Sequence, residues 1–168
     1  APDEHWRSFV APLPPSFIVK RGGGNKGRSV RLFGTALQSE GDPVASLIRA
    51  LLRLPESGDD WILEERVEVH ARIAQMTGTG AVSTARVVTL IEGDAEPRIM
   101  GSHFRVIAGD SITDNISDWQ TGKFSGNILA VPDLDTGVVT EAWAPNPDGI
   151  GYQWVKSHPR TDVPIEGF

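Results

Sequence analysis

Lysine and consecutive glycines occur together near the start of the chain, in a pattern suited to binding phosphate groups. The apolar residues 17–19 lead into Lys20, and a glycine-rich stretch follows that contains Gly22, Gly23, Gly24 and Lys26. Glycine adopts positive φ and lets the backbone approach a ligand closely, and a lysine ammonium is a point charge for phosphate oxygens. The stretch predicts a phosphate-binding loop. The alternative is a solvated hairpin tip, because glycine runs are also typical of turns.

The same stretch nearly matches a P-loop, but the pattern that follows it excludes one. Residues 22–29 fit G-x-x-x-x-G-K-[ST] except that Arg28 stands at the lysine position. A P-loop must open a helix whose N-terminus holds the phosphates. Residues 29–33 are apolar at alternate positions, which predicts a second strand. We therefore predict a glycine-rich β-hairpin.

Charged side chains also lie in three later strand-like segments. Glu64 and Glu65 interrupt an apolar run over residues 61–70, while Arg86 and Arg105 lie within runs at 83–91 and 98–106. Two arginines on paired strands could hold a phosphate or carboxylate through bidentate hydrogen bonds, and Asn115 could add a donor. A strand ending in two glutamates could present backbone groups to an adenine edge and a carboxylate to a ribose. Solvated strand faces and turns are the alternatives.

A helix and several turns would position these strands. Asp42 can cap a helix that begins at Pro43, and apolar residues with helical spacing continue to Leu54. A further strand is expected at 128–131, with turns at 133–137 and 146–149. Residues 1–16 contain several prolines and are interpreted as a lead-in segment without an element of its own.

Composition narrows the possible functions. The chain has 168 residues, 39% of them hydrophobic and 23% charged, which suits one globular domain. Its net charge of −6, without a basic run, argues against nucleic-acid binding. No stretch approaches the roughly 18 apolar residues of a membrane span, and no secretory signal pattern is present. Cysteine is absent and the four histidines are scattered, so we expect a cytoplasmic protein without a zinc site.

Taken in order, these segments resemble the ATP-grasp superfamily, most closely its sugar-transfer-associated branch, a relative of the glutamate-adding carboxylate–amine ligases. The resemblance runs from about Phe17 to the C-terminus. Its most specific parts are the T-x-R-V-V-T strand at 84–89, the pair Asp114-Asn115, and the ending from His158-Pro159 to Ile-Glu-Gly-Phe at 165–168.

The resemblance implies an α+β fold with ATP-grasp-like antiparallel sheets and a packed helix, in which two lobes hold ATP. Arg86, Arg105 and Asn115 would face the γ-phosphate and the acyl-phosphate formed from a small carboxylate substrate, which an amine or similar nucleophile then attacks. The residues implied to contact the nucleotide are Lys20, Gly22, Gly23, Gly24, Lys26, Glu64, Glu65, Val67 and Glu68.

The chain departs from the family at the metal site. ATP-grasp enzymes bind Mg²⁺ through an Asp and a downstream Glu-x-Asn, and no glutamate here has asparagine two residues on. We therefore expect Mg²⁺ only in a longer protein and no metal ligand in this chain. Residues 17–168 are interpreted as an incomplete ATP-grasp domain, inactive alone. A non-catalytic nucleotide-binding or interaction module of the same fold, or a β-rich structural domain, are the alternatives. The sequence does not predict the oligomeric state.

Overall fold

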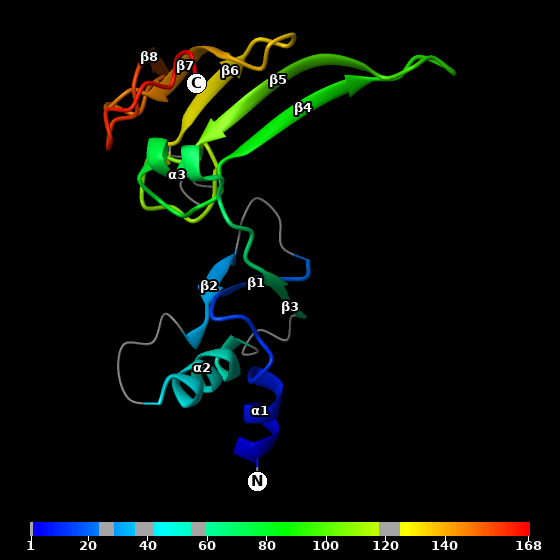
Figure 1. The fold of residues 1–168 in the computed structure, drawn as a ribbon, viewed down its shortest axis with the longest axis vertical. Helices are drawn as coiled ribbons and strands as arrows, with labels where there is room; N and C mark the ends of the chain where they lie inside the picture. Colours follow the sequence, from blue (N-terminus) through cyan, green and yellow to red (C-terminus); the bar gives the residue numbers. More distant parts are fainter. Residues whose placement is uncertain (1, 24–28, 36–41, 55–59, 118–124) are drawn as a thin grey trace. The chain divides into compact units, whose positions relative to one another are not determined.

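The computed structural model describes residues 2–23, 29–35, 42–54, 60–117 and 125–168. The fold is α+β with two antiparallel sheets, as predicted. The chain divides into two compact units, residues 1–67 and 68–168, where the sequence suggested a single domain from residue 17. Each unit has its own sheet and its own hydrophobic core, and the described residues form two helices in the first unit and one in the second (Figure 1).

The first unit contains a three-stranded sheet in the order β2-β1-β3. Strand β1 spans Phe17–Arg21, β2 spans Arg31–Phe33 and β3 spans Trp61–Glu65. Both neighbours run antiparallel to β1, so the predicted hairpin of β1 and β2 is confirmed. The predicted strand ending in Glu64 and Glu65 is confirmed as well.

Helix α2 (Pro43–Leu52) covers one face of this sheet. The Asp42 carboxylate accepts hydrogen bonds from the N–H groups of Val44 and Ala45 at 3.0 and 3.1 Å, so the predicted cap is confirmed. The apolar face of the helix buries Leu47, Ile48 and Leu51 in the core that also contains Phe17 and Val19 of β1. Periodicity and the cap were therefore sufficient to predict this helix.

The N-terminal segment also contains a helix, so the interpretation of residues 1–16 as a segment without an element is wrong. Helix α1 spans Pro2–Val10, and Val10 is only 3% exposed because it packs in the core beside α2. Pro2 does not disturb the helix, since the first turn does not use the N–H that proline lacks. The next prolines come only after Val10, beyond the end of α1.

The second unit contains a five-stranded antiparallel meander in the order β4-β5-β6-β7-β8. Its strands are β4 Thr84–Leu90, β5 Arg98–Val106, β6 Ile128–Pro132, β7 Val139–Pro145 and β8 Tyr152–Trp154. Strands β4, β5 and β6 confirm the predictions at 83–91, 98–106 and 128–131. Strand β5 pairs with β6 only at residues 104–106, so the rest of β4 and β5 projects as a two-stranded arm (Figure 1).

Helix α3 (Ala71–Thr77) was not predicted from the sequence, nor was β8. The helix is short, and its start is marked by His70, whose Nδ1 accepts a hydrogen bond from the N–H of Arg72 at 3.3 Å. It ends at Gly78, which has a φ of 66°. Among the described residues, no helix is both long enough and apolar enough to cross a membrane.

The core of the second unit lies on one face of its sheet. Seven buried residues form it: Met76, Val106, Ile128, Ala130, Val139, Ala142 and Ile165. The C-terminal segment folds back on this core, and His158 anchors it. The Nδ1 atom of His158 accepts from the N–H of Arg160, so Nε2 carries the proton and donates to the carbonyl of Ile107 at 2.9 Å. The opposite face of the sheet carries polar and aromatic side chains instead.

Candidate functional site

The sheet of the second unit gathers three basic side chains on the face opposite its core. Arg86 on β4 is the register partner of His103 on β5, and Thr84 is the partner of Arg105. Directly paired residues share a face, and so do residues two apart on one strand. Arg86, His103 and Arg105 therefore lie together, and we call this group the cationic face. The prediction that two arginines occur on paired strands is confirmed.

Arg105 carries an unsatisfied donor within this group. Its Nε atom is buried and has no hydrogen-bond partner among the described residues. A buried donor without a partner costs about 1–3 kcal/mol, and more when the group is charged. An anionic ligand on the cationic face would offset the repulsion among the basic groups, and it would satisfy this donor if the guanidinium turned toward the ligand. Among the three residues of the cationic face, Arg105 is thus the one that we expect to contribute most to the free energy of anion binding.

A loop adds Asp114 and Asn115 to the site. The Thr84 hydroxyl donates to the Asp114 carboxylate, which brings the loop beside β4. Buried Asn127 anchors the loop, because its Nδ2 donates to the carbonyls of Thr113 and Asn115 at 3.1 and 2.8 Å. The predicted amide donor of Asn115 is thus carried by one anchored loop, and the two predicted arginines are carried by one pair of strands.

His103 belongs to the site although the sequence analysis did not single it out. Burial lowers the pKa of His103 below its ordinary value, and the charges of Arg105 and Arg86 lower it further, while Asp114 acts in the opposite direction. The imidazole is therefore neutral at neutral pH, since its pKa lies below about 6.5. The signal in the sequence was its position two residues before Arg105 on the same strand, which places both on one face.

In the first unit, Lys20 and Glu64 lie together on the sheet face opposite the helices. The Lys20 ammonium is 2.6 Å from the Glu64 carboxylate, and both side chains are more than a third exposed. Glu64 is the register partner of Ile18, and Ile18 shares a face with Lys20 because the two are two residues apart on β1. Phe17 and Val19 alternate with them and lie in the core, so Lys20 and Glu64 are on the face away from the core. Two residues that the sequence assigned to nucleotide binding are thus neighbours on one face.

The remaining nucleotide-binding candidates lie around the ends of β1 and β3. Gly22 follows β1, and its N–H donates to the carbonyl of Asp60 at 2.8 Å. A Cβ on Gly23 would meet no described atom within 4 Å, so packing does not require glycine there. Gly24 and Lys26 lie outside the described residues. Val67 and Glu68 follow β3 and are exposed.

Glu65 ends β3 beside a small groove of the first unit. This groove has a volume of about 310 Å³ and is lined by Pro12, Leu13, Pro14, Phe17, Leu63, Glu64 and Glu65. Most of its lining is apolar, and the two carboxylates provide its charge. A flat apolar group with hydrogen-bond donors on its edge would match this lining. The expectation that the strand end presents backbone groups to an adenine edge and a carboxylate to a ribose stays a prediction.

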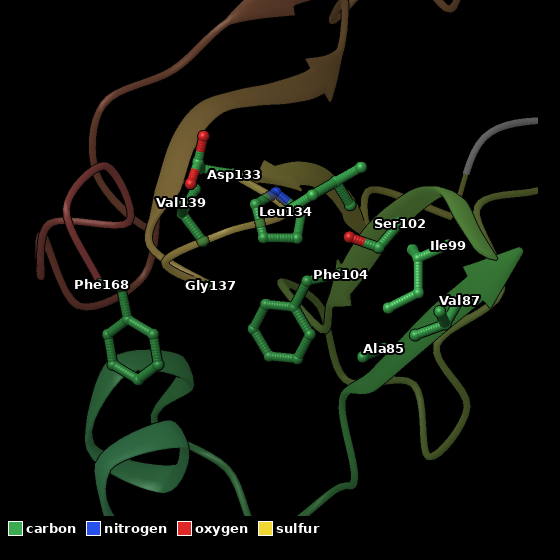
Figure 2. A pocket seen from close by; sticks show the side chains of 11 residues that line it. Ala85, Val87, Ile99, Ser102, Phe104, Asp133, Leu134, Gly137, Val139 and Phe168 are labelled. Carbon is green, nitrogen blue, oxygen red and sulfur yellow. The ribbon is translucent and has the colours of Figure 1, made fainter. Parts of the chain in front are cut away.

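A second groove lies on the opposite side of the β4–β5 pair from the cationic face. It has a volume of about 380 Å³ and is mostly apolar, with Ala85, Val87 and Phe104 on its floor and Leu134 and Phe168 on its sides (Figure 2). Ala85 and Val87 alternate with Arg86 along β4, so this groove and the cationic face are separated by the sheet. The groove is therefore not part of the candidate site.

The described residues contain no group of three or more His, Asp or Glu side chains that could hold a metal ion. A comparison of the chain with protein-family models, with curated proteins and with solved structures finds no match. The resemblance to the ATP-grasp superfamily therefore stays a prediction. What the structure adds is the grouping of the predicted residues on two sheet faces.

Proposed function

We propose that this chain is the ATP-binding portion of an ATP-dependent carboxylate ligase with an ATP-grasp-like fold. One observation carries the proposal: Arg86, His103 and Arg105 share a sheet face, and Arg105 has a buried Nε without a partner among the described residues. Such a face is suited to a multiply charged anion. The terminal phosphate of ATP and the carboxylate of a substrate are both anions of this kind.

Each residue has a defined role in this proposal. The planar guanidinium groups of Arg86 and Arg105 bind phosphoryl or carboxylate oxygens in a bidentate manner, and Asn115 adds an amide donor. Lys20 binds the nucleotide phosphates, which replace the Glu64 carboxylate as the partner of its ammonium group. When bound, ATP supplies the phosphoryl group that activates a carboxylate for attack by an amine or similar nucleophile. The arginines stabilise the negative charge that develops during the transfer.

The residues fit an anion but do not fit a protein magnesium site. The orphaned Arg105 donor supports binding of a phosphate, whereas the described residues provide no cluster of metal ligands. The same observation favours a second candidate, a nucleotide-binding module of this fold without catalysis. Because ATP is abundant in the cytoplasm, either function implies a cytoplasmic protein.

Calorimetric titration with the non-hydrolysable analogue AMP-PNP, with and without Mg²⁺, tests the proposal. We expect Arg105→Gln to weaken binding about ten- to hundredfold, because a charge-assisted hydrogen bond contributes about 1.5–3 kcal/mol. Arg98→Gln is the matched control: Arg98 lies on the same strand but is exposed and paired with Glu92 at 2.9 Å. The affinity of the Arg98→Gln variant for AMP-PNP should equal that of the unmodified chain.

Two further measurements, AMP-PNP titration of Lys20→Ala and release of ADP from ATP, test the proposed functions. Lys20→Ala should weaken AMP-PNP binding while the protein stays folded, because the ion pair of Lys20 with Glu64 lies on the surface and surface pairs contribute little to stability. A chain that binds no AMP-PNP, or one whose affinity is unchanged in both Arg105→Gln and Lys20→Ala, would contradict the proposal. Release of ADP from ATP in the presence of carboxylates separates a ligase from a non-catalytic module.

A further inference from the structure

The sheet face that carries the arginines continues into a row of aromatic residues. Arg105 on β5 is paired with Leu129 on β6, Leu129 with Trp143 on β7, and Trp143 with Trp154 on β8. Directly opposed residues lie on one face of an antiparallel sheet. The row therefore crosses four strands on the face opposite the buried core, from a guanidinium at one end to two indoles at the other.

Tyr152 extends the aromatic end of this face. It is two residues from Trp154 on β8 and pairs with Pro145 on β7, so it lies on the same face. Trp154 is 51% exposed and Tyr152 is 42% exposed, which is high for side chains of this size. We call Trp143, Tyr152 and Trp154 the aromatic surface. Large exposed apolar groups that cluster in this way are typical of binding surfaces.

The two indole rings are already held in place. The Nε1–H of Trp143 donates to the Glu141 carboxylate at 3.2 Å, and the Lys156 ammonium lies 5.0 Å from the centre of the Trp154 ring. A ring that is fixed before binding loses little conformational entropy when a ligand stacks on it. About half of the Trp154 side chain remains open despite the lysine, so the surface is both ordered and accessible.

The charge and spacing along the row define the ligand that would fit it. Neighbouring strands are about 4.8 Å apart, so two strand spacings, or about 10 Å, separate the Arg105 and Trp143 positions. Apolar Leu129 lies between them. This arrangement matches one anionic group joined by a short apolar linker to a flat ring. It does not match ATP, in which a triphosphate and a polar ribose separate the terminal phosphate from adenine.

Resting on the proposed function, we propose that this face binds the carboxylate substrate of the ligase, and that this substrate carries a flat apolar ring. Arg105 and Arg86 hold the carboxylate, and the aromatic surface holds the ring through stacking. The position of the ring then fixes the carboxylate beside the arginines, where phosphoryl transfer takes place. This assigns a substrate class, an aromatic or similarly flat carboxylic acid, to the site.

Titration of the full chain with 4-phenylbutyrate and with butyrate tests this assignment. The two acids share a carboxylate and differ in the ring, so we expect 4-phenylbutyrate to bind about tenfold more tightly, the effect of about 1–2 kcal/mol expected for one stacked ring. Trp154→Ala and Trp143→Ala should remove this difference, and Trp154→Phe should retain most of it. Phe9→Ala is the control, because Phe9 is a comparably exposed aromatic residue on α1.

The same titrations give results that would overturn the assignment. Equal affinity for the two acids, or a ring preference that Trp154→Ala leaves intact, would show that the aromatic surface does not hold the substrate. A loss of AMP-PNP affinity in Trp154→Ala as large as the loss for 4-phenylbutyrate would assign the surface to the nucleotide base instead. AMP-PNP that fails to bind while the ring preference persists would remove the ATP proposal and leave the aromatic subsite standing.

Discussion

At the level of single residues, His103 differs from Arg86 and Arg105 because its charge depends on pH. In the free protein its pKa lies below the ordinary value, through burial first and then through the charges of Arg105 and Arg86. Asp114 is the one acidic group that acts against this shift. An anion bound on the cationic face favours the protonated imidazole and so raises this pKa. Binding is therefore coupled to the uptake of a proton.

We predict that anion affinity increases as the pH falls. Above the pKa of the complex His103 is neutral in both states and contributes no charge; as the pH falls through about 6.5 and below, the complex gains a proton that the free protein lacks. Sulfate is the suitable probe, because its charge stays constant between about pH 8 and 5.5. We expect about tenfold tighter binding at the lower pH, equivalent to a shift of one pKa unit.

His103→Gln should abolish this pH dependence and leave the affinity at pH 8 nearly unchanged. His5→Gln serves as the control, because His5 is exposed on α1, in the other unit. A pH dependence that survives in His103→Gln would show that the titrating group lies elsewhere.

At the level of elements, the loop that carries Asp114 and Asn115 depends on one buried amide. Asn127 is fully buried and makes three hydrogen bonds to backbone groups: its Oδ1 accepts from the N–H of Ala108 at 3.1 Å, and its Nδ2 donates to the carbonyls of Thr113 and Asn115. The loop has no helix or strand of its own between residues 107 and 117. Besides this side chain, the loop is held by the contact of Thr84 with Asp114, by the ion pair of Asp110 with Arg160, and by hydrogen bonds from Ser125 to the carbonyls of Asn115 and Ile116.

We predict that Asn127→Ala lowers both stability and anion affinity. Removing the amide leaves buried backbone groups unpaired, at about 1–3 kcal/mol for each, and it releases the loop that carries Asp114 and Asn115. Chemical denaturation should show a clear loss of unfolding free energy, and AMP-PNP titration should show weaker binding under conditions where the variant is folded. Asn146→Ala removes one side-chain hydrogen bond, to the carbonyl of Ile150 in a surface turn, and should lower stability by only about 0.5–1.5 kcal/mol. Equal effects of the two variants would contradict this account.

At the level of the whole molecule, the cationic face and the aromatic surface both belong to the second unit. Residues 68–168 have their own core, and the strands that carry both surfaces pair only with one another. The unit is within the size range at which domains fold alone. The first unit is smaller, and a domain of that size buries a smaller fraction of its surface.

We therefore predict that residues 68–168 fold without residues 1–67 and keep the proposed acid-binding property. Expressed alone, they should unfold in a single cooperative transition and bind 4-phenylbutyrate with about the affinity of the full chain. A non-cooperative unfolding transition, together with an NMR spectrum that lacks dispersed signals, would contradict the prediction of an independent unit.

Much of the fold could be predicted from local patterns. Alternation of apolar residues over 29–33 predicted β2, and short apolar or β-branched runs predicted β1, β3, β4 and β5. A capping aspartate with proline after it, together with helical spacing, predicted α2. These signals depend only on neighbours in the sequence. Helix α1 was missed because the prolines of residues 1–16 were taken as breakers, although only Pro2 lies within the helix. Helix α3 and strand β8 were missed because they are too short to show a period.

The sequence by itself determined which residue types the candidate site could use: the lysine with its glycines, the glutamate pair, the two arginines and the asparagine. Only the tertiary structure decided which of them share a face and what lies beside them. Arg86 joins His103 and Arg105, and Trp143 and Trp154 line up with Arg105, because of strand register. Register is set by pairing between segments far apart in the chain, and a shift of one residue would turn each side chain to the opposite face. No local pattern contains that information.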